Sequence, residues 1–174
     1  MLELHASVQS EDALSVLKTL SMNDFLGGPG RPPHQILVDD IYAGTLENAL
    51  EALCLDHKVQ LDLGNPMADP AWEQIAHHDS FRFLLPQDAD GYAWAGVVVA
   101  DSDNHIVGAY TGCSLAVSDQ QKGKGLGRAL VSMRFIVDCE LPLWEHDEAG
   151  YSQAGYAAHV SAYNHLNTLP DPAR

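Results

Sequence analysis

One stretch of the sequence decides the fold: Val117-Ser118-Asp119-Gln120-Gln121-Lys122-Gly123-Lys124-Gly125-Leu126-Gly127-Arg128-Ala129-Leu130-Val131. The residues before it predict a strand and those after it a helix, so its glycines stand where strand gives way to helix. Glycine lets the backbone approach a ligand closely. Unpaired N–H groups at a helix start, with the helix dipole behind them, bind anions. The stretch therefore predicts a phosphate site.

Basic residues gather in this stretch, although the chain as a whole is acidic. The 174 residues include 24 acidic and 9 basic side chains, a formal charge of −15. Lys122, Lys124, Arg128 and Arg134 are four of those nine, and no acidic residue lies between Asp119 and Asp138. The overall charge repels phosphate backbones and anionic membranes, so we expect no nucleic-acid or membrane partner. It serves solubility, and it favours a cationic partner such as an amine.

Spacing separates this stretch from two common phosphate-binding motifs. A P-loop requires GxxxxGK[ST], but Gly123-Lys124 is followed by Gly125, and Ser118 stands where the first glycine is needed. A dinucleotide fingerprint requires GxGxxG, and both possible starts end on a residue other than glycine.

The stretch resembles the signature of the GNAT superfamily of acyl-CoA-dependent N-acetyltransferases. There a strand ends in an [R/Q]xxGx[G/A] loop, whose amides hold the diphosphate of coenzyme A. The resemblance implies acetyl-CoA as co-substrate. It implies cofactor contacts along the backbone of the preceding strand and around the loop, at Leu115, Ala116, Val117, Lys122, Gly123, Lys124, Gly125, Leu126, Gly127 and Arg128. Lys122 stands where the family has Arg or Gln; a second register would begin at Gln120.

Working outward, periodicity and capping residues predict the other elements. We expect helices after Ser10, after Thr45, from Asp69-Pro70 to about His77, from Gly125 to Asp138, and from Ser152 to His165. We expect strands at 2–8, 59–63, 81–85, 92–100, 105–117 and 141–145.

These elements predict one domain over 1–174, with a loop at 26–35 that we expect to be mobile. The expected fold class is α/β, with a GNAT-like mixed, mostly antiparallel central sheet flanked by helices. Little sequence follows Leu166, so we expect the last two strands of that fold to be missing. The edge strand of a shortened sheet could pair with the same strand of a second copy, so a homodimer is one expectation.

The resemblance also directs the search for catalytic residues. Family members often use a tyrosine on the fourth helix to protonate the leaving thiolate, and Tyr163 is the first choice here, with Tyr156 on the same face. Packing against the sheet is the alternative for both. For the base, Glu145 and His146 cluster after the last expected strand. A charged surface loop is the more common explanation for such a cluster.

The implied function is transfer of an acetyl or other acyl group from acyl-CoA to the primary amine of a small molecule or protein. Two alternatives remain open: an inactive GNAT-like domain that binds CoA or a protein, and an acidic protein that neutralises a basic partner. No pair of histidines has chelating helical spacing, so no metal is expected. The N-terminus has no signal-peptide pattern and no pair of cysteines has CxxC spacing, so we expect a cytoplasmic protein.

Overall fold

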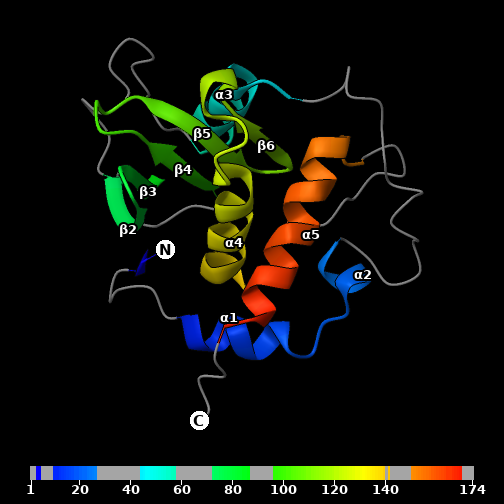
Figure 1. Cartoon of the computed structure of the whole chain (residues 1–174). Helices are drawn as coiled ribbons and strands as arrows, with labels where there is room; N and C mark the ends of the chain where they lie inside the picture. The colour runs from blue at the N-terminus through cyan, green and yellow to red at the C-terminus, as the bar shows by residue number, and fades with distance from the viewer. Residues whose placement is uncertain are drawn as a thin grey trace.

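The computed structural model describes residues 3–4, 10–26, 44–57, 72–86, 96–139, 141 and 150–169. An open antiparallel sheet forms the centre of the molecule, and helices lie against it, which is an α/β architecture (Figure 1). The strands are β1 (Glu3–Leu4), β2 (Trp72–His78), β3 (Phe81–Pro86), β4 (Gly96–Ala100), β5 (Ile106–Thr111) and β6 (Ser114–Val117). The helices are α1 (Ser10–Leu17), α2 (Met22–Phe25), α3 (Leu46–His57), α4 (Leu126–Asp138) and α5 (Gln153–Asn167), with a 3₁₀ turn at Asp119–Gln121.

The strands are hydrogen-bonded in the order in which they follow one another in the chain, and every described pair is antiparallel. The helix predicted from Asp69-Pro70 to His77 is wrong, because Trp72–His78 is strand β2. Its partner β3 follows after a tight turn in which Asp79 has a φ of 52°. Pairing along the whole of β3 outweighs the local signal of a proline at a helix start.

The single strand predicted over 105–117 is also wrong, because the chain reverses within it. Strands β5 and β6 form a hairpin in which Thr111 pairs with Ser114 across Gly112 and Cys113. Gly112 has a φ of 49°, the left-handed conformation that short hairpin turns require. Apolar residues continue on both sides of the turn, so the sequence pattern alone does not mark the reversal.

Side chains alternate between two cores, one on each face of the sheet. Val97 and Val99 join Phe83 in the core that α1, α2, α4 and α5 cover. Val98 and Leu84 point to the other face, where they meet the buried face of α3. Figure 1 shows α4 in front of the strands and α5 beside it.

Capping explains where the helices begin. Thr45 Oγ1 accepts a hydrogen bond from the Asn48 amide at 3.2 Å, which confirms the predicted start of α3. Ser152 caps α5 in the same way through the Gly155 amide, at 3.1 Å. The predicted helix from Gly125 to Asp138 is confirmed as α4.

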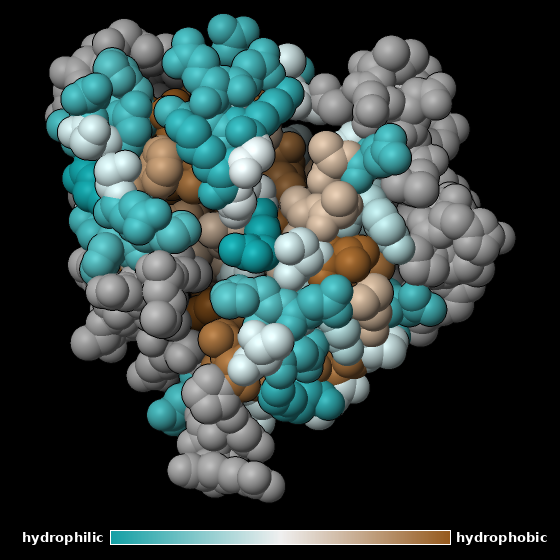
Figure 2. All heavy atoms as spheres, viewed as in Figure 1, coloured by the Kyte–Doolittle hydropathy of each residue, from teal (hydrophilic) through white to brown (hydrophobic). Residues whose placement is uncertain are grey.

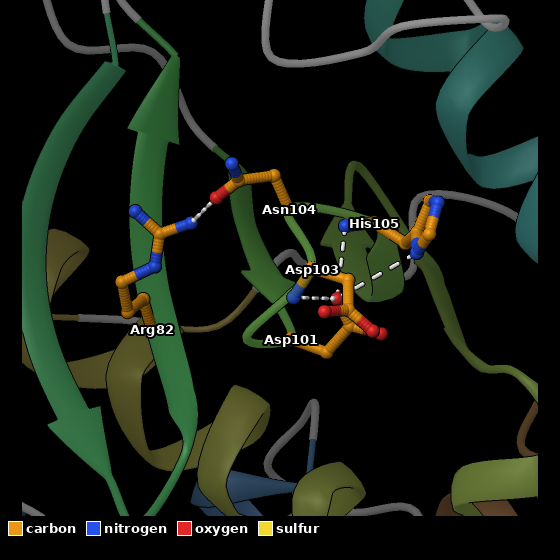
Figure 3. Close-up of polar contacts among 5 residues, drawn as sticks. All are labelled: Arg82, Asp101, Asp103, Asn104 and His105. Atoms are coloured by element: carbon orange, nitrogen blue, oxygen red, sulfur yellow. Dashed lines mark hydrogen bonds and ion pairs between the residues drawn. The ribbon is translucent and has the colours of Figure 1, made fainter.

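The turn between β4 and β5 is held by its own polar side chains (Figure 3). Asp101 Oδ1 accepts hydrogen bonds from the Asp103 amide at 3.0 Å and the His105 amide at 2.9 Å. Asn104 accepts a bond from Arg82 on β3. The side chains of Asp101 and Asn104 therefore hold the turn together and link it to β3.

Several predicted features lie outside the described residues: the strands at 59–63 and 141–145 apart from Leu141, and the loop at 26–35 apart from Leu26. Only Gly96–Ala100 of the strand at 92–100 is described, and it is β4. Within the described part of the chain, no helix combines the length and apolar character that a membrane span requires.

Gly108 on β5 is expected to be essential to the docking of α4. A Cβ built there would lie 2.9 Å from Val99 Cγ1 and 3.1 Å from Leu130 Cδ1 of α4. Gly108→Ala should therefore lower the free energy of unfolding by about 1–3 kcal/mol, the usual cost of overpacking, measured by urea titration. Gly127→Ala is the control, since its Cβ would make only a 3.4 Å contact with Ala158. Equal effects of the two substitutions would contradict this account.

Candidate functional site

The glycine-rich loop between β6 and α4 has the backbone of an anion site. Gly123 and Gly125 have φ values of 78° and 80°, a conformation that other residues rarely adopt. Gly125 is the N-cap of α4, and no side chain caps this helix. In the described structure the amides of residues 125–128 donate to no acceptor, and the first amide to do so is that of Ala129, to Gly125 at 3.0 Å. Several donors therefore point out of the helix start together.

Strand β6 brings a second row of donors and acceptors to the same loop. The Ser118 amide donates to Val107 at 2.8 Å, and Ala116 faces Ala109 across the hairpin. Bonded and unbonded pairs alternate in an antiparallel ladder. The N–H and C=O groups of Leu115 and Val117 therefore point away from β5, toward an edge on which no described strand lies. Figure 2 shows apolar atoms between α5 and the hydrophilic region that lies above α4.

The basic side chains predicted to face the phosphate have different surroundings. Lys122 pairs with Asp119 at 2.6 Å and holds the pKa of that carboxyl below its usual value. Lys124 donates to Gln121 at 2.5 Å. Arg128 is exposed, and it alone among the described lysines and arginines has neither a hydrogen-bond nor an ion-pair partner.

Arg134 does not belong to this cluster, which corrects the sequence-based grouping. It is 4% exposed and forms an ion pair with Asp138 one turn along α4. Its guanidinium lies 5.7 Å from the centre of the Tyr110 ring and donates to the Tyr110 carbonyl at 3.4 Å. Arg134 therefore supports the contact between α4 and the sheet.

An open groove runs beside the loop, along α5. Its lining comes from Arg128 of α4 and one face of α5: Tyr156, Ala157, Val160, Ser161, Asn164, His165 and Thr168. Burial, with the charge of Arg128, lowers the pKa of His165. The groove was absent from the sequence-based prediction, because the spacing within α5 does not show which face meets α4.

Tyr163 points away from this groove. Its hydroxyl donates to the Leu20 carbonyl at 2.9 Å, and its ring lies 5.3 Å from that of Phe25. In this arrangement Tyr163 has a packing role, but it holds α5 against α2 and the segment before it, not against the sheet as the alternative from the sequence had it. Tyr156, seven residues earlier, lines the groove instead. Glu145 and His146, the predicted bases, lie outside the described residues.

A buried pair that sequence reasoning missed joins β5 to α5. Tyr110 and His159 are 1% and 2% exposed, and the Tyr110 hydroxyl lies 2.9 Å from His159 Nε2. His159 Nδ1 lies 2.7 Å from the Gly155 carbonyl, which can only accept, so Nδ1 carries the proton and Nε2 accepts from Tyr110. Burial lowers the pKa of His159 to about 4 and raises that of Tyr110. The histidine is therefore neutral and structural.

No protein-family model, no curated protein and no solved structure matches this chain. Within the described residues, no three histidine, cysteine or carboxylate side chains lie close enough together to hold a metal ion. The candidate site consists of the loop, the edge of β6 and the groove along α5.

The buried histidine predicts an acid-sensitive fold. Its pKa is about 4 in the folded chain, against an ordinary value of 6.5 that the unfolded chain should approach. As pH falls, the unfolded state binds the proton first. The contribution of His159 to stability is therefore fully present above pH 6.5 and is lost as pH falls toward 4. The free energy of unfolding should fall by up to ~1.4 kcal/mol per pH unit for this proton. Urea titrations from pH 7 to 5 measure it, and a slope unchanged in His159→Gln would contradict the assignment.

Proposed function

We propose that this protein is an acyl-CoA-dependent N-acyltransferase that moves an acetyl or other acyl group to a primary amine. The observation that carries the proposal is the continuity of β6 with the glycine-rich loop. The outward backbone groups of Leu115 and Val117 suit the amides of a pantetheine arm, and the free amides of residues 125–128 suit the diphosphate beyond it. The resemblance of this stretch to the GNAT signature supports the same reading.

In the proposed reaction the amine nitrogen attacks the thioester carbonyl, a C–N bond forms and the C–S bond breaks. The nitrogen loses a proton, and the thiolate gains one. The chain contributes position, because the strand edge and the loop fix the two ends of the donor. The acidic surface raises the local concentration of a cationic acceptor, although the amine must be deprotonated to attack.

We propose Tyr156, in place of Tyr163, as the proton donor on α5. The Tyr163 hydroxyl is engaged with Leu20, whereas the Tyr156 hydroxyl has no described partner and shares the groove with Arg128. An inactive domain that binds CoA is the second candidate. It is favoured by the same observation, since the tyrosine first expected to act is used for packing.

Gly125→Val tests the cofactor site. A Cβ at Gly125 would force a side chain into a φ of 80° and would lie 3.7 Å from the Arg128 guanidinium. The variant should bind CoA at least ~10-fold more weakly, because a charged hydrogen bond contributes about 1.5–3 kcal/mol. Calorimetry with CoA and a thiol-release assay with acetyl-CoA and an amine panel measure it.

Gly112→Val is the matched control for that experiment. Gly112 also has a positive φ, with open space around it, and it lies at the far end of β6 from the loop. It should fold less stably yet keep its affinity for CoA. Normal CoA binding by a folded Gly125→Val protein would refute the site. Binding without thiol release for any amine would favour the inactive domain.

The two tyrosines of α5 should behave differently when each loses its hydroxyl. Tyr156→Phe should lower kcat by ~10²-fold or more, as loss of a general acid does, with little change in CoA affinity. Tyr163→Phe should instead lower stability by about 0.5–1.5 kcal/mol through loss of one hydrogen bond, and should leave kcat nearly unchanged. Thermal unfolding and steady-state rates separate the outcomes. A rate loss confined to Tyr163→Phe would restore the original assignment.

A further inference from the structure

The groove along α5 has the polar chemistry of an anion site. Of its lining residues none is acidic, in a chain whose formal charge is −15. Arg128 supplies a guanidinium, His165 an imidazole and Asn164 an amide, while Ser161 and Thr168 add hydroxyls. The side chains of Arg128, Asn164 and His165 make no hydrogen bond or ion pair to other groups in the described structure.

Arg128 and His165 line the same groove, and their side chains interact electrostatically. Burial lowers the pKa of the His165 imidazole, and the positive charge of Arg128 lowers it further. An anion between them would reverse that effect, since it would attract both a guanidinium and a protonated imidazole. Arginine forms paired hydrogen bonds to phosphate oxygens, and the Asn164 amide and the Ser161 hydroxyl can donate to the remaining ones, whereas the Thr168 hydroxyl already donates to the His165 carbonyl at 2.6 Å.

We propose that this groove is a binding site for a phosphate monoester, held by Arg128, Asn164 and His165. Arg128 also lies beside the glycine-rich loop, since its Nη2 is 3.7 Å from a Cβ built on Gly125. A ligand bound there would therefore be adjacent to the diphosphate site. Two sources offer this chemistry: the 3′-phosphate of CoA itself, which rests on the proposed function, and a separate phosphorylated ligand, which does not.

Asn164→Asp is the decisive variant, because it places a carboxylate in the groove at an exposed helix position. Asn48→Asp makes the same chemical change at an exposed position of α3, away from the groove. Calorimetry measures CoA and dephospho-CoA, and amide chemical shifts of labelled protein follow titration with inorganic phosphate. His165→Gln, which removes only the imidazole, provides a second variant if Asn164→Asp unfolds.

The wild type should bind CoA at least ~10-fold more tightly than dephospho-CoA, as one well-formed charged contact would give. Asn164→Asp should remove that preference while leaving dephospho-CoA unaffected, and Asn48→Asp should preserve it. Equal binding of the two cofactors, with phosphate shifting the α5 amides in wild type but not in Asn164→Asp, would assign the site to a separate ligand. This outcome also supports the site.

The proposal fails if wild-type protein shows no preference for CoA and phosphate shifts no amide of α5. It also fails if Asn164→Asp and Asn48→Asp have equal effects on every ligand. Failure of the proposed function is a different result, namely no binding of either cofactor. In that case the phosphate titration alone decides the groove, by shifting the α5 amides or leaving them unchanged.

Discussion

The close approach of α4 to the sheet at Gly108 positions the rest of the molecule. With no side chain at 108, Leu130 of α4 can contact β5 directly, and the start of the helix is held beside the end of β6. The glycine-rich loop must therefore turn within a few residues. Its positive φ values at Gly123 and Gly125 are the geometric consequence, and they leave the first amides of α4 free.

Buried polar contacts fix α5 against this frame. Tyr110 and His159 satisfy one another where both side chains are almost fully buried. A buried polar group without a partner is costly, so this contact between β5 and α5 restricts how α5 can dock. The docking turns Tyr156 and His165 toward Arg128 and leaves Tyr163 on the side that meets α2.

The site therefore combines local and distant parts of the chain. The loop and the edge of β6 are continuous in sequence, which is why a motif could identify them. The groove needs one residue of α4 and a face of α5 that begins 28 positions later, at Tyr156. The basic side chains divide in the same way: Lys122 and Lys124 are paired within their own turn, and Arg128 has no hydrogen-bond or ion-pair partner among the described residues.

The sequence by itself determined α4, α5, the cap at Thr45 and the glycine-rich turn, because capping, helical periodicity and glycine conformation are local effects. It did not determine that Trp72–His78 is a strand or that the chain reverses at Gly112, since pairing between neighbouring strands decides both. The burial of Arg134, the orientation of Tyr163 and the Tyr110–His159 bond likewise required tertiary structure. Each depends on contacts between segments far apart in the chain, and no spacing rule within one helix encodes which face its neighbours will cover.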